Sequence, residues 1–275
     1  MMRYIYSILL SLSLLFVACD SRVDSYPSID IIAHAGGVAH GFLGTNSREA
    51  LEHSLLEEYR FVEFDFLFTA DSVLVAVHDW ESFNKRTGHE HKGDSAPTYK
   101  EFKSRLIDEV FTPLSAAEIN EVFEQDTTLC LVTDKISSPR VLEGYFPNIK
   151  ERMVVEAFSY DDYVALQELG YYRVLYSCMA SDLYQAVFKH LLFHRLFTGP
   201  KIEWITMYSG ELDNLFFRII EALSAFKMAV FTVNDYSEIP HNLLPKVGMV
   251  YSDILGPVWD YSCDYFKAGN RRNKR

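Results

Sequence analysis

The segment that decides the fold is Phe61–Phe66, which reads FVEFDF. Successive side chains of a β-strand point to opposite faces, so Glu63 and Asp65 share one face. The phenylalanines on both sides of this pair predict a covered strand, and an exposed acidic face is the alternative. Buried like charges repel one another unless a cation lies between them, and hard oxygen ligands suit Mg²⁺ or Ca²⁺.

This segment is one of nine short apolar runs that alternate with helix-like stretches along the chain. Such alternation is typical of an α/β protein with parallel strands and crossover helices. No low-complexity linker interrupts residues 29–267, which favours one domain, a single (β/α)8 TIM-type barrel, over an open sheet. The runs are Ile29–Ala33, Phe61–Phe66, Val73–Val77, Thr128–Thr133, Met153–Glu156, Tyr172–Tyr176, Ile202–Met207, Met228–Val233 and Met249–Tyr251.

The predicted barrel is irregular around its second and third strands. Only Leu67–Ser72 separates these two runs, which is too short for a crossover helix. Either the two runs pair as a hairpin, which also accounts for a ninth run, or the barrel lacks a helix there.

Polar residues follow many of the runs. In a (β/α)8 barrel the carboxyl ends of the strands form one rim, which carries the catalytic groups. Side chains from seven runs therefore predict one site, and they are His34, Glu63 with Asp65, His78 with Asp79, Thr133 to Lys135, Glu156, Asn234 with Asp235, and Ser252 with Asp253.

His34 and His78 are the candidate general acid and base. The pKa of an ordinary histidine lies near 6.5, so small changes in the local field select either protonation state. Lys135 is a candidate for binding an anionic substrate, and a surface salt bridge is its alternative. Two histidines beside a carboxylate pair and a lysine are the groups that divalent-metal and acid–base chemistry needs.

Composition excludes several classes of protein. The 275 residues are 49% hydrophobic and 23% charged, which is typical of a globular protein and excludes disorder or several membrane spans. The net charge is −12, so we expect no nucleic-acid partner, because phosphate neutralisation needs a basic surface. The basic residues of the tail, 268–275, are too few to reverse this.

The N-terminus predicts export. A positive start is followed by an apolar stretch, Ile5–Val17, too short to span a bilayer and typical of a secretory signal. Residues 15–19, LFVAC, resemble a bacterial lipoprotein signal. The resemblance implies a signal peptide over 1–18, lipidation of Cys19, a tether over 19–28 and a lipid-anchored location in the bacterial cell envelope. An ordinary cleaved signal with an incidental cysteine is the alternative.

Several short motifs of the chain together resemble the glycerophosphodiester phosphodiesterase family, which shares its barrel with phosphatidylinositol-specific phospholipases C. They occur in the family order between about Asp30 and Leu255, and they are Ile32–Gly37 (IAHAGG), Thr45–Ser47 (TNS), Glu63–Asp65 (EFD), Val77–Asp79 (VHD), Thr232–Asn234 (TVN) and Ser252-Asp253. The resemblance implies that His34 and His78 are the general acid and base, that Glu63 and Asp65 bind a divalent metal, and that Lys135 lies near the phosphate.

The chain departs from the family pattern at two places that matter for chemistry. Thr133 stands where the family has its third acidic ligand, so Asp134, through a shift of register, or Glu156, from the next strand, is the candidate replacement. Ala35 stands where the family has an arginine that follows the first histidine, which removes a bidentate phosphate contact. Arg86 is the candidate for supplying this lost charge.

These observations predict a divalent-metal-dependent phosphodiester hydrolase. It would act on glycerophosphodiesters or related lipid or envelope headgroups, with one histidine as base and the other as acid. The alternative is a catalytically weak, lipid-anchored barrel that binds an envelope phosphodiester or glycan, which the changes at Ala35 and Thr133 favour. A third possibility is a lyase that forms a cyclic product, as the related phospholipases do.

Overall fold

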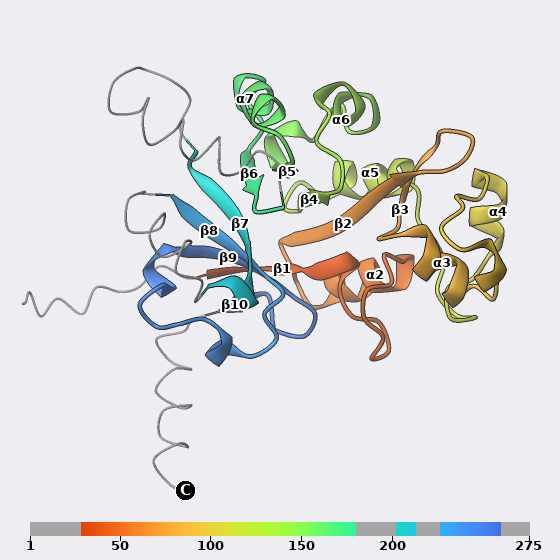
Figure 1. The fold of residues 1–275 in the computed structure, drawn as a ribbon, viewed down its shortest axis with the longest axis horizontal. Helices are drawn as coiled ribbons and strands as arrows, with labels where there is room; N and C mark the ends of the chain where they lie inside the picture. Colours follow the sequence, from red (N-terminus) through yellow and green to blue (C-terminus); the bar gives the residue numbers. More distant parts are fainter. Residues whose placement is uncertain (1–28, 180–201, 213–225, 260–275) are drawn as a thin grey trace, which may run out of the picture.

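A computed structural model of the chain describes residues 29–179, 202–212 and 226–259. In these residues eight parallel strands close into one barrel, because β1 pairs with β2 on one side and with β9 on the other (Figure 1). The predicted (β/α)8 barrel is therefore confirmed. Its strands are β1 (Ile29–Ala33), β2 (Phe61–Phe68), β4 (Cys130–Asp134), β5 (Met153–Ala157), β6 (Arg173–Ser177), β7 (Trp204–Tyr208), β8 (Lys227–Phe231) and β9 (Val247–Ser252).

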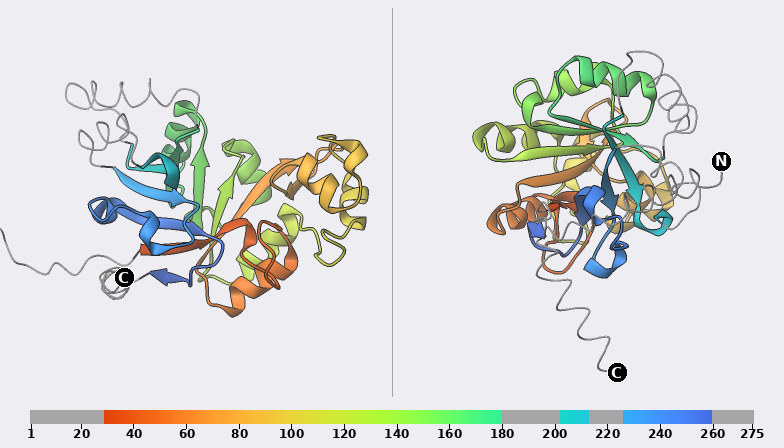
Figure 2. Two further views of the ribbon diagram at one scale, coloured as in Figure 1. Left: turned by 60° about the horizontal axis from the view of Figure 1, so that its bottom comes forward. Right: turned by 90° about the vertical axis from the view of Figure 1, so that its left-hand side faces the viewer.

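In the described residues, helices connect the strands from β1 to β6 and cover the outside of this part of the barrel (Figure 2). Several begin at a hydroxyl side chain that accepts a hydrogen bond from the first turn, such as Ser47 before α2 and Ser115 before α5. The crossover helices in the described residues are α2 (Arg48–Leu56), α5 (Ala116–Gln125), α6 (Pro139–Tyr145) and α7 (Tyr160–Glu168). Short 3-10 turns are η1 (His34–Gly36), η2 (Glu90–Lys92), η3 (Lys150–Arg152), η4 (Ser209–Glu211), η5 (Tyr236–Glu238) and η6 (Leu244–Lys246).

The irregularity lies where the sequence predicts it, and it is a hairpin. Strand β3 (Leu74–Ala76) runs antiparallel to the end of β2, with Phe66 opposite Ala76 and Phe68 opposite Leu74. The tight turn between them is closed by Thr69, whose N–H donates to the carbonyl of Val73. The predicted run Val73–Val77, which exceeds the eight strands of the barrel, is thus β3 and lies outside the barrel wall. A further short strand, β10 (Val258–Trp259), pairs antiparallel with β1.

An insertion follows this hairpin and extends beyond it on one side of the barrel (Figure 1). It contains α3 (Trp80–Arg86) and α4 (Tyr99–Ser104). Phe83 and Phe102 stack with their ring centroids 5.0 Å apart, and both belong to an apolar cluster separate from that of the barrel. The insertion therefore has its own small core, which supports the strand end that carries His78.

The barrel buries two apolar layers. The larger lies between the strands and the outer helices. The smaller fills the barrel interior and contains one or two side chains from most strands, which are Ile32, Phe61, Cys130, Val132, Val154, Leu175, Ala229, Met249 and Tyr251. The next inward-facing side chains along the strands meet above this apolar layer, at the carboxyl-terminal rim.

The predicted signal peptide (1–18), the tether (19–28) with Cys19, and the basic tail (268–275) lie outside the described residues. Among the helices that the structure describes, none is long and apolar enough to cross a membrane. β1 begins at Ile29, at the amino-terminal end of the barrel and opposite the rim that holds the polar residues.

The turn after β1 gives a test of how tightly this rim is built. Gly37 has φ +100°, and a Cβ there would lie 2.1 Å from the Oγ of Ser54. We expect Gly37→Ala to lower the free energy of unfolding by about 2 kcal/mol or more, from backbone strain and overlap, as measured by urea denaturation.

Gly144 is the matched control, because it lies within α6 and a Cβ added there would have no other atom within 4 Å. Gly144→Ala should leave stability unchanged or raise it, since alanine favours helix. Equal stability of both variants would contradict a tightly packed turn at Gly37.

Candidate active site

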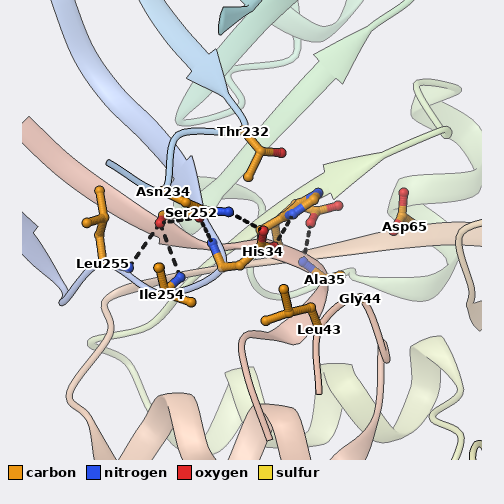
Figure 3. A network of polar contacts seen from close by, with 12 residues as sticks. His34, Ala35, Leu43, Gly44, Asp65, Thr232, Asn234, Ser252, Ile254 and Leu255 are labelled. Atoms are coloured by element: carbon orange, nitrogen blue, oxygen red, sulfur yellow. Dashed lines mark hydrogen bonds and ion pairs between the residues drawn. The ribbon is translucent and has the colours of Figure 1, made fainter. Parts of the chain in front are cut away.

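The carboxyl-terminal ends of β1, β2, β4 and β9 bring polar side chains from distant parts of the sequence to one rim. His34 directly follows β1, Glu63 and Asp65 lie on β2, Asp134 ends β4, and Asp253 follows β9. Figure 3 shows His34 and Ala35 between Asp65 on one side and Asn234 with Ser252 on the other. Parallel pairing of β1 with both β2 and β9 explains this meeting.

Three carboxylates form the centre of the site. One oxygen each from Glu63, Asp65 and Asp134 lie within 4.8 Å of one another. Glu63 and Asp65 are 1% and 2% exposed, so both point into the barrel and not to solvent. The structure thus brings together the acidic pair on β2 and one of the two candidates for the missing third acid.

Asp134 takes this place because of the strand register. Asp65 pairs with Asp134, and Glu63 pairs with Val132, so these residues share the inner face. Thr133 pairs with Phe64 on the outer face, where its buried Oγ1 makes no hydrogen bond with the residues that the structure describes. Asp134 therefore takes the place expected of residue 133, because successive side chains of β4 point to opposite faces.

Backbone and amide groups hold the two acids of β2 in place. The N–H of Ala35 donates to Oε2 of Glu63 at 2.7 Å, because Ala35 adopts a left-handed conformation with φ +50°. Asn46 donates from Nδ2 to Oδ2 of Asp65 at 2.9 Å, and its Oδ1 accepts from the N–H of Asp65 at 3.2 Å. The left-handed backbone at Ala35 thus orients the carboxylate of Glu63, and the side chain of Asn46 orients that of Asp65.

Burial and mutual repulsion disfavour the ionised forms of these acids. Burial raises the pKa of Glu63 well above its usual range, and the charges of Asp65 and Asp134 add to this. Burial, followed by the charge of Asp65, raises the pKa of Asp134 to about 6, against the positive charge of Lys135. A cation among the three oxygens would offset this repulsion.

Glu156 lies nearby but outside this group of three. Its Oε1 accepts a hydrogen bond from Oγ1 of Thr206 at 2.7 Å. Burial, with the charge of Asp134, raises the pKa of Glu156 to about 8. Of the two candidates for the third acid, Asp134 has the geometry of a ligand and Glu156 forms an adjacent buried acid.

His34 is held by a chain of hydrogen bonds from the last two strand ends (Figure 3). Its Nδ1 lies 2.8 Å from Oδ1 of Asp253, whose Oδ2 accepts from Nδ2 of Asn234 at 2.7 Å. Oδ1 of Asn234 accepts in turn from Oγ of Ser252 and the N–H of Asp253. Because an ionised carboxylate only accepts, Nδ1 carries the proton and Nε2 is the atom left for chemistry.

The charges around His34 favour its protonated form. Burial lowers the pKa of His34, but the hydrogen bond and charge of Asp253, with the charges of Asp65 and Asp134, outweigh it, and the pKa is raised. Burial raises the pKa of Asp253, and its bonds from His34 and Asn234 outweigh this, so that pKa is lowered. Both shifts favour the ion pair between His34 and Asp253.

His78 lies on the insertion side of the rim and is more exposed, with 60% of its side chain accessible. Its Nδ1 lies 2.8 Å from Oδ2 of Asp79, whose other carboxylate oxygen accepts from the N–H of Ser82 at the start of α3. His78 and Asn46 line one small cavity of about 30 Å³. Asn46, which donates to Asp65, is the residue that this cavity shares with the carboxylate centre.

The two candidate phosphate-binding cations differ in their surroundings. Lys135 is exposed, with φ +63°, and its N–H donates to Oδ1 of Asp134 at 2.5 Å. Arg86 lines the same cavity as His78, but its guanidinium donates to Oδ2 of Asp108 and to the carbonyl of Gly44. The charge of Arg86 is thus shared with a carboxylate, and Lys135 is the cation that is free of any ion pair with the described residues.

Asn46, Asn234 and Asp253 belong to the sequence motifs, but no role was predicted for them individually. The structure shows that they are the groups that orient Asp65 and His34. In the sequence, Asn234 and Asp253 follow strand-like runs and Asn46 belongs to the motif TNS before α2, which was the available signal.

The three carboxylates fit a hard divalent cation. Their oxygens converge, Glu63 and Asp65 are buried and Asp134 is half-buried, and the pKa values of Glu63 and Asp134 are raised in the cation-free protein. Carboxylate oxygens are the ligands that Mg²⁺ and Ca²⁺ prefer.

The ion pair at His34 predicts a pH-dependent stability in the metal-free protein. A histidine whose pKa is raised on folding stabilises the fold below its unfolded pKa, and this is lost as pH rises through the folded pKa. We expect Asp253→Asn to lower the pKa of His34 in an NMR titration, and to lower the melting temperature more at pH 5.5 than at pH 9.

The control is Asp94→Asn, at an exposed aspartate of the insertion. It should change neither the titration of His34 nor the pH dependence of stability. An unchanged His34 titration in Asp253→Asn would contradict the role of this ion pair.

Comparisons with known proteins add to this geometry. No protein-family model matches the chain, and no curated protein matches it in sequence. Solved structures are similar in fold, and three of them show the range of the likeness. A glycerophosphodiester phosphodiesterase from Thermotoga maritima matches with a TM-score of 0.58 and 17% identity, covering 82% of this chain and 94% of its own.

A second glycerophosphodiester phosphodiesterase, from Parabacteroides distasonis, has a TM-score of 0.57 and 17% identity and covers 90% and 98% of the two chains. The third is an Oleispira antarctica phosphodiesterase in complex with its product sn-glycerol-3-phosphate, with a TM-score of 0.54, 18% identity and coverage of 87% and 97%. The resemblance read from the motifs is thus confirmed at the level of fold: over most of its length the chain has the barrel of solved glycerophosphodiester phosphodiesterases.

Proposed function

We propose that the protein is a divalent-metal-dependent phosphodiester hydrolase that acts on glycerophosphodiesters or related lipid or envelope headgroups. One observation carries this proposal. Three converging carboxylates, two of them buried, lie beside His34 on the rim where barrels of this kind hold their catalytic groups. The fold shared with solved glycerophosphodiester phosphodiesterases supports the same reaction class.

Glu63, Asp65 and Asp134 would hold the divalent ion. When bound, the ion supplies a Lewis acid that polarises a phosphoryl oxygen and lowers the pKa of a bound hydroxyl or water. Ala35 and Asn46 keep the carboxylates of Glu63 and Asp65 oriented toward it. Asp134 has the backbone N–H of Lys135 as its own support.

The two histidines are arranged for proton transfer. Each has its Nδ1 on a carboxylate, Asp253 for His34 and Asp79 for His78, so each offers Nε2 to a substrate. One Nε2 accepts the proton of the attacking oxygen, and the other gives a proton to the leaving alcohol. Lys135 supplies the positive charge that attracts a phosphodiester to an otherwise acidic protein.

The test is hydrolysis of bis-p-nitrophenyl phosphate and of a glycerophosphodiester, with Mg²⁺ or Ca²⁺ and with a chelator. We expect chelator to abolish turnover, and added ion to raise the melting temperature by offsetting carboxylate repulsion. His34→Gln and His78→Gln should each lower kcat by about 10²–10⁴-fold, because each removes a proton-transfer group.

The matched control is His91→Gln, at an exposed histidine of the insertion. It should leave kcat and KM unchanged. Turnover that survives the chelator would contradict metal dependence. Product analysis separates hydrolysis from formation of a cyclic phosphate.

A catalytically weak binding barrel is the second candidate, and one observation favours it. Ala35 lacks the side chain that contacts phosphate in the family pattern, and Arg86 is already bound to Asp108. A protein that binds glycerol 3-phosphate in the presence of Mg²⁺, but hydrolyses no phosphodiester, would establish this candidate in place of the hydrolase.

We also propose that the protein is exported and anchored by lipid at Cys19 in a bacterial envelope. Support comes from residues 1–19, whose apolar stretch ends in LFVAC. The described barrel begins at Ile29, on the face opposite the site, so a tether over 19–28 would leave the site directed away from its anchor.

Cys19→Ser tests the anchor. We expect the wild-type chain to sediment with membranes and to partition into Triton X-114 detergent, and the variant to lose this partitioning. Cys178→Ser serves as control because it removes a cysteine within the barrel. Equal partitioning of wild type and Cys19→Ser would contradict lipidation.

A further inference from the structure

Tyr251 places a hydroxyl group in the interior of the barrel, where no residue of the described structure bonds to it. The side chain is 3% exposed, and its oxygen is buried without a hydrogen-bond partner. Its ring belongs to the apolar layer inside the barrel, with Ile32, Val132 and their neighbours. A phenylalanine would fill the same space without carrying an unsatisfied polar atom.

The position of Tyr251 brings its ring to the edge of the candidate active site. Tyr251 lies two residues before Asp253, which directly follows β9 (Val247–Ser252), so the two side chains leave the chain on the same side. Its ring meets the ring of His34 edge-on, with centroids 6.4 Å apart, and that of Phe231 at 6.2 Å. The phenol ring therefore lies beside the imidazole of His34, on the side of the barrel interior.

The neighbours of the ring place it near the carboxylates. Phe61 and Val132 belong to the same interior cluster as Tyr251, and Glu63 and Asp134 are the next residues on the same face of their strands. Burial raises the pKa of Tyr251 well above its usual range, and the charges of Glu156, Glu63, Asp134 and Asp65 add to this. The phenol therefore keeps its proton and remains a hydrogen-bond donor.

The carboxylates accept hydrogen bonds from groups other than the phenol, so the phenol hydroxyl can donate to a bound group. Glu63 accepts from Ala35, Asp65 from Asn46 and Glu156 from Thr206. A buried donor that no protein group satisfies is a donor for which a ligand oxygen is the natural acceptor.

We propose that the hydroxyl of Tyr251 donates a hydrogen bond to an oxygen atom bound at the Glu63–Asp65–Asp134 cluster. The oxygen is either that of a water on the divalent ion or a phosphoryl oxygen of the substrate, which share the chemistry of an electron-rich acceptor. This inference deepens the proposed function and rests on its metal and phosphate site. It also supplies a donor in a site where Ala35 provides no side-chain contact to phosphate.

The test compares Tyr251→Phe with the wild-type full chain by isothermal titration calorimetry. Mg²⁺ or Ca²⁺ is titrated alone, and inorganic phosphate is then titrated into the metal-loaded protein. A metal-bound water as acceptor predicts that the variant binds the ion about three- to tenfold more weakly. A phosphoryl oxygen as acceptor predicts unchanged ion binding and phosphate binding weakened by the same factor.

Tyr145→Phe is the matched control, since it also removes one phenol hydroxyl. That hydroxyl accepts from the N–H of Leu74 and lies at the β2–β3 hairpin, away from the carboxylates. It should change neither affinity. The melting temperature of metal-free Tyr251→Phe should equal or exceed that of the wild type, because an unsatisfied buried donor is removed. Tyr251→Met, which also lacks the hydroxyl, provides the same comparison if the phenylalanine variant does not fold.

Two outcomes would overturn the inference. The first is unchanged affinity of Tyr251→Phe for both the ion and phosphate, which would make the phenol a filler of the interior. The second is a wild-type protein that binds neither. A wild type that binds both, and whose variant binds one more weakly, upholds the inference even if no phosphodiester is hydrolysed, and that result would contradict the proposed reaction alone.

Discussion

The repulsion among three converging carboxylates is the constraint on which the rest of the site depends. Two unit charges about 5 Å apart repel by about 3 kcal/mol at an effective dielectric constant of 20, and this site brings three such groups together. The left-handed backbone at Ala35, which aims an N–H at Glu63, and the side chain of Asn46, which bonds Asp65 twice, keep two of them in place. A barrel that closes between β1 and β2 is what puts these holding groups beside the acids.

The same negative field explains how an acidic protein can suit an anionic substrate. The net charge is −12, so the protein as a whole repels a phosphodiester. Near the site, however, the hydrogen bond and charge of Asp253, with the charges of Asp65 and Asp134, raise the pKa of His34 and so favour its protonated form, and Lys135 follows Asp134 at the end of β4. The site thus places cationic groups beside its acids.

How much of this could be predicted depends on the range of the interactions involved. Strand and helix alternation is a local signal, and it predicted the barrel, its irregular third run and the rim on which Glu63 and Asp65 meet Asp134. Alternation within Cys130, Val132 and Asp134 could also have assigned Asp134 to the inner face, without a motif. The pairing of Arg86 with Asp108 and the bond from Asn234 to Asp253 could not be predicted, because they join residues that only the folded loops bring together. Tyr251 gave no signal at all, since an aromatic residue in a buried strand is ordinary.

Ala35, which follows His34, contributes to the site through its backbone. Ala35 is 2% exposed, and its N–H is the group that holds Glu63. Under the proposed function, contacts to a phosphoryl group would come from Lys135 at the rim and from the phenol of Tyr251 within the barrel. The carboxylate centre and the hydrogen bond from His34 to Asp253 are formed with an alanine at this position, so neither needs a side chain there.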